Sequence, residues 1–259
     1  MLYVSWEEGK KRICAIKPDA FMLDEGWFAE YQQAFDMYYN IHWCYPLRKV
    51  FREKLPAYEF VDMARTELET MPPYATPISF IDNHDTVKNQ LWEGRFETVV
   101  GHDRMEAAMV IIYTSFGIPF IYNGNEICDD GEHTLYANRF NAPNLRINWS
   151  HALTPEAARR MRMLRELSAL RKNNAVLTAG TTQYLPVGDR EHVIAYTREH
   201  AGKRITVIVN TADTTIESTV DVALSPAAHP LLQKDFVVTK QDDALHFAAG
   251  PGGYMVIEH

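Results

Sequence analysis

The most informative stretch of the chain is a short apolar run that ends in a cluster of polar side chains. Residues Ile78–Ile81 form the run, and Asp82, Asn83, His84 and Asp85 follow it directly. Polar groups placed after a buried strand lie at the edge where α/β barrels carry their catalytic residues. The same residue types also favour turns and helix caps, so a purely structural turn is the alternative interpretation. We interpret the cluster as a candidate site at the end of a strand.

A second group of acids follows a predicted strand near the start of the chain. The strand spans Ala20–Leu23, and Asp24, Glu25, Gly26 and Trp27 come directly after it. A carboxyl beside an apolar ring suits a proton donor, because an apolar neighbour disfavours the ionised form. The alternative is that both acids are solvated loop residues. The pattern favours a general acid at the end of this strand.

Together these segments resemble the alpha-amylase family of retaining glycoside hydrolases, in which one barrel strand ends in Asn-His-Asp and another ends in a small residue and Glu. The resemblance assigns catalytic roles to Glu25, as general acid/base, and to Asp85, as support for the transition state. It assigns substrate contacts to five residues: His84, Asn83, Trp27, Asn125 and Glu126. Asp24 stands where the family usually has Gly or Ala, so the pattern leaves open which acid is the proton donor.

A third segment adds to the resemblance. Residues 117–126 read Gly-Ile-Pro-Phe-Ile-Tyr-Asn-Gly-Asn-Glu. They are similar to the last barrel strand of the family, with its Gly-x-Pro, an apolar pair, Tyr and a closing Glu. On this basis Asn125 and Glu126 would line the mouth of the barrel. The alternative for Glu126 is that it only holds neighbouring loops in place.

The elements that must position these residues alternate between short strands and helices. Strands are predicted at Ala20–Leu23, Ala34–Met37, Ile78–Ile81 and Phe120–Tyr122, and helices at Ser5–Ile16, Tyr45–Leu55, Ala57–Thr70, Arg95–Phe116 and from Pro155 onward. In the helix predicted over Arg95–Phe116, the apolar residues are expected on one side. Four strands are half of the eight that close a TIM barrel.

After residue 179 the pattern changes to alternation with a period of two, as in residues 193–197 and 205–209. Further short strands are predicted at 216–222, 234–238, 244–247 and 254–258, with Gly250–Gly253 as a turn between the last two. We therefore predict an α/β chain. Residues 1–176 would form the C-terminal half of a (β/α)8 TIM-type barrel, and residues 177–259 an antiparallel β-sandwich domain.

Composition excludes several classes of function. A formal net charge of −8 argues against a nucleic-acid surface, because phosphate binding needs clustered Lys and Arg. The longest apolar region, Ala107–Tyr122, is too short and too interrupted for a membrane span. The first residues show no signal-peptide pattern, and the cell compartment stays open.

No residue is assigned as a metal ligand. The three cysteines are far apart, and no Cys-x-x-Cys spacing suggests zinc. The acidic run Asp129–Glu132 lacks the full spacing of a calcium loop and is interpreted as solvated. The resemblance leaves calcium open as a cofactor of a full-length enzyme, in a part of the family fold that this chain does not carry.

One expected part of the site is missing from the chain. Retaining hydrolysis needs two carboxyl groups about 5 Å apart, one as acid/base and one as nucleophile. The family places its nucleophile in a Gly-x-Arg-x-Asp-like motif before the acid, and no such motif occurs here. We expect the chain to be part of a longer enzyme, or a short protein that pairs with another polypeptide. Alone, it is expected to be inactive and to self-associate through its open half barrel.

The substrate that the resemblance implies is an alpha-glucan or maltooligosaccharide, cleaved with retention of configuration. Two alternatives remain at this point. One is an alpha-glucan transglycosylase, which would use the same residues. The other is a non-catalytic carbohydrate-binding or interaction protein built on the same frame, although such a protein would not need the acid at Glu25.

Overall fold

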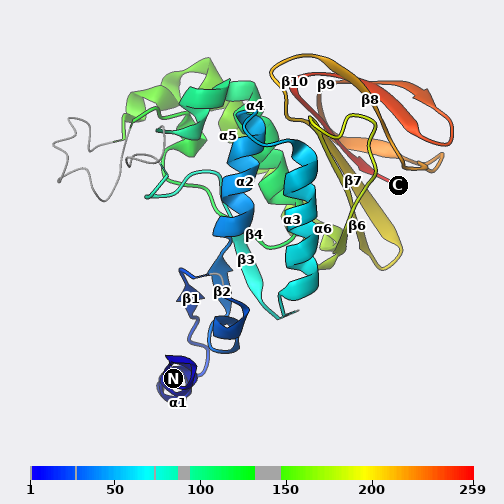
Figure 1. The fold of residues 1–259 in the computed structure, drawn as a ribbon. Coiled ribbons are helices and arrows are strands. Elements are labelled where there is room, and N and C mark those ends of the chain that lie inside the picture. Colours follow the sequence, from blue (N-terminus) through cyan, green and yellow to red (C-terminus); the bar gives the residue numbers. More distant parts are fainter. Residues whose placement is uncertain (1, 27, 73, 87–93, 132–146) are drawn as a thin grey trace.

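The computed structural model describes residues 2–26, 28–72, 74–86, 94–131 and 147–259. They form two sheets with helices between them (Figure 1). The first sheet has four parallel strands in the order β1-β2-β3-β4. The second is antiparallel, and β10 is the strand that links most of its members. Helix α1 lies at the end of the molecule opposite the second sheet.

The first part of the chain alternates strands and helices in the predicted order. Its elements are α1 (Leu2–Ile16), β1 (Leu23–Asp24), η1 (Ala29–Gln33), β2 (Met37–Tyr39), α2 (Ile41–Phe51), α3 (Ala57–Thr70), β3 (Thr76–Ser79), α4 (Phe96–Thr114) and β4 (Ile118–Pro119). They are followed by η2 (Asn125–Ile127), η3 (Trp149–Leu153), α5 (Pro155–Asn173) and α6 (Ala175–Ala179). The domain boundary placed after residue 176 falls inside α6 and stays a prediction.

The ends of the observed strands are displaced by one to three residues from the predicted ones. In β3, for example, the ladder pairs Tyr39 with Ile78 and Ile78 with Ile118, and the strand ends at Ser79. Phe80 and Ile81 are fully buried but lie beyond the strand. An apolar run in the sequence indicates which residues are buried, not where a strand ends. Here the buried residues continue beyond the last strand pairing, so the pattern could not locate the end of β3.

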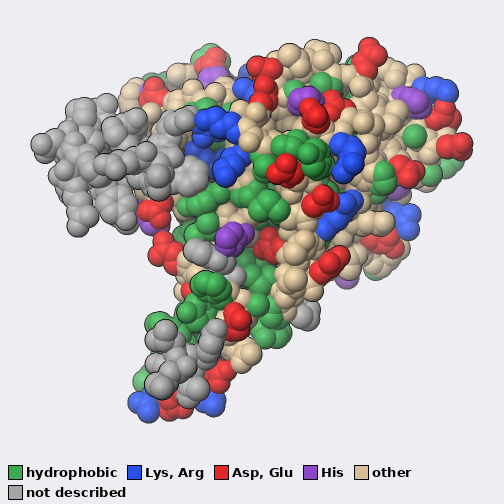
Figure 2. All heavy atoms as spheres, viewed as in Figure 1, with side chains coloured by type: hydrophobic (Ala, Val, Ile, Leu, Met, Phe, Trp, Pro, Cys, Tyr) green, Lys and Arg blue, Asp and Glu red, His purple; other side chains and the backbone are tan. Residues whose placement is uncertain are grey.

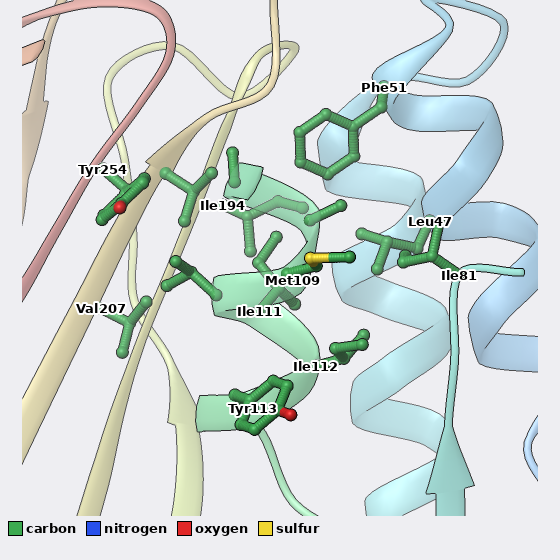
Figure 3. Close-up of a cluster of buried hydrophobic side chains, with 14 of the residues drawn as sticks. Leu47, Phe51, Ile81, Met109, Ile111, Ile112, Tyr113, Ile194, Val207 and Tyr254 are labelled. Carbon is green, nitrogen blue, oxygen red and sulfur yellow. The ribbon is translucent and has the colours of Figure 1, made fainter. Parts of the chain in front are cut away.

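The second half of helix α4 differs from the prediction because it is buried on every side. All ten residues from Met105 to Thr114 are buried, including the charged Glu106. A helix that is apolar all round belongs in an interior. Figure 3 shows why: α4 side chains such as Met109 and Ile111 lie between α2 with its neighbouring loop on one side and the β-domain strands on the other.

The antiparallel domain is a curled sheet with two buried faces. Its strands are β5 (Thr181–Tyr184), β6 (Val193–His200), β7 (Lys203–Asn210), β8 (Ile216–Val220), β9 (His229–Gln241) and β10 (Leu245–Glu258). Along β6, Ile194 and Tyr196 pack toward the helices, while Val193 and Ala195 pack inside the β-domain. The period of two in the sequence therefore reports two cores, one on each face of the sheet.

The turn predicted at Gly250–Gly253 is wrong. These residues lie within the single strand β10, and the register to β9 shifts between Ala249 and Tyr254. Gly252 has φ of 62°, and an added Cβ would lie 2.8 Å from the backbone of Asp103. The glycines therefore allow a bulge where β10 crosses α4 at close range, which a turn signal cannot distinguish from a hairpin.

Within the described ranges, no helix combines the length and the apolar character that crossing a bilayer requires.

The edges of the parallel sheet generate a prediction about association. In the described part of the chain, β1 and β4 each pair on one side only. Figure 2 shows hydrophobic side chains along the narrow end of the molecule, and Phe21 and Phe28 are 61% and 50% exposed. Unpaired strand edges beside exposed apolar groups favour chain–chain contact. We expect light scattering of the purified chain to give a mass above 29.7 kDa that rises with concentration. A concentration-independent monomer would contradict this.

Glu67 on α3 generates a prediction about pH. Its carboxylate accepts a hydrogen bond from the Tyr38 hydroxyl at 2.7 Å, and burial raises the pKa of Glu67 to about 6. Because the folded pKa lies above the unfolded value, the stabilising effect of the neutral acid is complete below about pH 4.5 and is lost as pH rises through 6. The loss amounts to about 2 kcal/mol.

Urea unfolding of Glu67→Gln against the wild type between pH 4 and 7 checks this. We expect the wild type to lose stability relative to the variant as pH rises. Glu69→Gln, at an exposed position on the same helix, is the control. Parallel pH curves for the wild type and Glu67→Gln would show that the Glu67 carboxyl is not responsible.

Candidate active site at the strand ends

The structure brings together three predicted site residues that are far apart in the sequence. The Nε2 atom of His84 lies 3.6 Å from Oε1 of Glu25 and 3.6 Å from Oδ2 of Asp85. The three ligating atoms all lie within 4.8 Å of one another. Glu25 is the most open of the group, with 66% of its side chain exposed, against 29% for His84 and 32% for Asp85.

The parallel sheet explains this convergence. Glu25 directly follows β1, and His84 and Asp85 lie in the loop that follows β3. Strand β2 lies between these two strands and ends at Tyr39. Because the strands are parallel, their carboxyl ends meet at one edge of the sheet, and the side chains that follow them share that edge.

The neighbouring acid Asp24 is turned away from the group. Its Oδ1 accepts a hydrogen bond from the Gly26 amide at 2.7 Å, and its Oδ2 accepts a long one from Gln32 Nε2 at 3.4 Å. Burial raises the pKa of Asp24, and the bond from Gly26 acts in the opposite direction. The structure therefore makes Glu25, and not Asp24, the acid that faces His84.

Asn83 does not face outward as a sugar contact should. Its side chain is buried, and its Oδ1 accepts hydrogen bonds from the amides of Asp85, at 3.0 Å, and Thr86, at 2.9 Å. The hydroxyl of Thr86 in turn accepts from the Asn83 amide at 2.8 Å. The Asn83 carboxamide thus shapes the turn that presents His84 and Asp85, a geometry that short polar side chains favour. The predicted substrate contact of Asn83 stays a prediction.

Asn125 and Glu126 make hydrogen bonds within the protein, and their predicted substrate contacts stay predictions. Asn125 is buried and donates from Nδ2 to Oδ2 of Asp82 at 2.9 Å. Glu126 is partly buried, and its Oε2 accepts from the Gly124 amide at 2.8 Å. This contact agrees with the alternative in which Glu126 holds a loop. Trp27 lies outside the described residues, so its predicted stacking role stays a prediction.

Three half-buried tyrosines near the group were not predicted. Burial raises the pKa of Tyr39, and the negative charges of Glu25 and Asp85 raise it further. Burial likewise raises the pKa of Tyr45 and of Tyr122, and Asp85 contributes to both shifts. The charge of Asp85 therefore contributes to the raised pKa of all three tyrosines. Tyr39 is the last residue of β2, and Tyr122 follows β4. Both therefore lie at the carboxyl ends of parallel strands, the same place that identified Glu25 and His84 as site residues.

A buried ionic network supports the loop after β3. Asp82 is fully buried, and its Oδ1 pairs with Nη1 of Arg48 on α2 at 2.5 Å. The same carboxylate accepts from the Phe96 amide at 3.1 Å and from Asn125 at 2.9 Å. One carboxylate thus connects α2, the start of α4 and the loop after β4 behind the candidate site.

The acidic run after β4 is partly buried, which corrects its interpretation as a solvated loop. Asp129 is 1% exposed and pairs with the fully buried Arg95, whose Nη2 lies 3.1 Å from Oδ2 of Asp129. Asp130 is exposed, and Glu132 lies outside the described residues. Buried carboxylates require such partners, and nothing in the local sequence identified Arg95 as one.

The chain was compared with family models, curated proteins and solved structures. No family model matches the chain. A cyclomaltodextrinase from Bacillus sp. is 28% identical over 215 residues, 79% of this chain and 36% of the relative. A maltogenic alpha-amylase from Bacillus acidopullulyticus is 26% identical over 225 residues, 82% of this chain and 36% of the relative. The chain thus spans about a third of the length of these curated relatives.

The chain is similar in sequence to members of the alpha-amylase family. The predicted resemblance is confirmed. The fold agrees: a maltogenic alpha-amylase structure from Thermotoga neapolitana superposes with a TM-score of 0.75 at 18% identity, over 98% of this chain and 58% of that one. The predicted fold class, half of a TIM-type barrel followed by an antiparallel β-domain, is confirmed as well.

The geometry of the group suits acid–base chemistry on a ligand at the sheet edge. Glu25 and Asp85 offer two carboxylates whose oxygens lie within 4.8 Å of each other, with an imidazole beside both. The acid is exposed, and the other two groups are held by a turn.

The buried network predicts a large effect of one substitution. Asp82→Ala removes the carboxylate and leaves Arg48 buried without its charged partner, which costs about 3–5 kcal/mol of folding stability. Urea unfolding monitored by tryptophan fluorescence measures the loss. The control is Glu8→Ala, which removes an exposed pair with Arg12 and should change stability by no more than about 0.5 kcal/mol. Equal effects of the two substitutions would contradict the central role of Asp82.

Proposed function

We propose that this chain contributes the proton donor and the substrate-gripping residues of a glycoside hydrolase that cleaves alpha-glucosidic bonds in starch-type oligo- or polysaccharides. The observation that carries the proposal is the group formed by Glu25, His84 and Asp85 at the carboxyl ends of β1 and β3. The named activities of the relatives, a cyclomaltodextrinase and a maltogenic alpha-amylase, support the substrate class.

In this proposal Glu25 acts as the general acid and then as the general base. Its exposed carboxyl can approach a glycosidic oxygen from the open side of the sheet edge. It donates a proton as the bond to the leaving sugar breaks, and it later removes a proton from the water that attacks the anomeric carbon.

His84 and Asp85 hold the sugar ring in this proposal. Both are about one-third exposed, so each retains an open side. The turn built by Asn83 keeps them in place without a ligand. Groups held in advance act most strongly when the ring flattens toward an oxocarbenium ion, because their hydrogen bonds to its hydroxyls then shorten.

The nucleophile is proposed to come from outside the 259 residues. The described group contains two carboxylates, Glu25 and Asp85, and the family role of Asp85 is support of the transition state. The curated relatives are about three times as long as the matched region, which leaves room for a further carboxylate. On this basis the chain binds a glucan weakly but does not hydrolyse it.

The test combines ligand binding with an assay of hydrolysis. Saturation-transfer NMR of the purified chain should show contact with maltotriose and little with cellotriose, which has β-linkages. His84→Ala and Glu25→Gln should reduce the maltotriose signal severalfold. Glu30→Gln, at an exposed position on η1, is the matched control and should leave the signal unchanged. Release of reducing sugar from starch or maltotriose should stay at background.

Two outcomes would contradict the proposal in different ways. Equal signals for both trisaccharides, or no response to His84→Ala, would remove the alpha-glucan site. Hydrolysis by the chain alone that disappears in both Glu25→Gln and Asp85→Asn would show that these two carboxylates suffice, and that no external nucleophile is needed.

A further inference from the structure

A second group of chemically active side chains lies outside the candidate active site. It lines a cavity of about 340 Å³ between the first turns of α4, the residues that follow η2 and the segment that leads into α5. Glu97, His102 and Cys128 contribute a carboxylate, an imidazole and a thiol to its wall. Asp130 and His151 lie on the same wall. Among the described lining residues there is no Lys or Arg.

The positions of three of these groups suit one cation. One ligating atom each from Glu97, His102 and Cys128 lies within 4.8 Å of the other two. Glu97 Oε1 and His102 Nδ1 are already in hydrogen-bond contact, and Cys128 contacts the same carboxylate. Converging sulfur, nitrogen and oxygen ligands are typical of tetrahedral zinc sites.

We propose that Glu97, His102 and Cys128 form a zinc site. A water molecule completes the tetrahedron. The donor set selects zinc over calcium, because calcium takes oxygen ligands while thiolate and imidazole suit zinc. On binding, the Cys128 thiol loses its proton to solvent and the sulfur becomes the ligand.

The surroundings of Glu97 favour this assignment. Arg160 on α5 donates to both oxygens of Glu97, from Nη2 at 2.7 Å and from Nη1 at 3.2 Å. Each carboxylate oxygen has a second lone pair, so the carboxylate can hold a metal while Arg160 orients it. The guanidinium charge is shared with a second carboxylate, since Oε1 of Glu106 lies 3.6 Å from Nε of Arg160.

The metal would connect segments that otherwise meet only through side chains. Glu97 and His102 lie on either side of the break in α4 at Gly101, where φ is 80°. Cys128 closes η2, which follows β4. Coordination would therefore fix the kinked start of α4 to the loop after β4, and a ligand that binds only the folded chain raises its stability. This inference does not depend on the proposed glucan site.

Metal titration of the purified 259-residue chain is the experiment. Competition against a chromogenic chelator should give one zinc per chain. Cobalt(II) in place of zinc should give the near-ultraviolet charge-transfer absorption of a thiolate ligand. Cys128→Ser should abolish that absorption and weaken zinc binding at least tenfold, and His102→Ala, whose side chain is 44% exposed, should also weaken zinc binding at least tenfold. Zinc should raise the melting temperature, and a chelator should reverse the rise.

Two control variants keep the result specific. Cys14→Ser removes a thiol on α1 that is distant in sequence, and His229→Ala removes an exposed imidazole on β9; both should bind like the wild type. Far-UV circular dichroism of each metal-free variant checks that it is folded. An unchanged cobalt spectrum in Cys128→Ser, zinc affinity insensitive to His102→Ala, or displacement of zinc by millimolar calcium would each overturn the proposal.

Discussion

The rest of the structure depends on the buried carboxylate of Asp82. A fully buried charge is tolerated only when its partners are close and numerous, and Asp82 has a guanidinium, a backbone amide and a carboxamide. These partners come from α2, α4 and η2, so satisfying one carboxylate fixes three elements around the loop after β3. His84 and Asp85 follow Asp82 within that loop, and their positions are thereby set from behind, while their open sides stay free for a ligand.

In this arrangement buried polar groups hold the site in shape, and exposed groups face the solvent. Residues that point inward, such as Asn83 and Asn125, hold the turn and the network by hydrogen bonds. Residues that point outward, Glu25 above all, keep enough exposure to meet a substrate. Preorganisation of this kind lets polar groups act on a reacting ligand without rearranging, which is the largest single contribution in many active sites. The charge of Asp85 also contributes to the raised pKa values of Tyr39, Tyr45 and Tyr122, so these rings lie near the group.

The β-domain is joined to the barrel part through a shared core, with α4 at its centre. Alternate residues of β6, β7 and β10 pack against the helices, and the others fill the interior of the β-domain (Figure 3). Side chains on both faces of β6 and β7 are buried, which explains why these strands are easily recognised in the sequence. It also means that the parallel sheet, although short, is supported through α4 by a much larger body of packed side chains.

The sequence by itself determined the order of strands and helices, the resemblance to the alpha-amylase family, and which side chains follow the ends of β1 and β3, because periodicity and strand-end chemistry are local properties. It located Glu25, His84 and Asp85 as one group, since carboxyl ends of parallel strands share an edge. It could not choose the role of Asn125, or find Arg48, Arg95 and Arg160 as partners of buried acids, because those contacts join residues 34 or more positions apart. Only tertiary packing decides which polar side chains turn inward, where a missing partner costs several kcal/mol, roughly 3–5 for a buried ion pair.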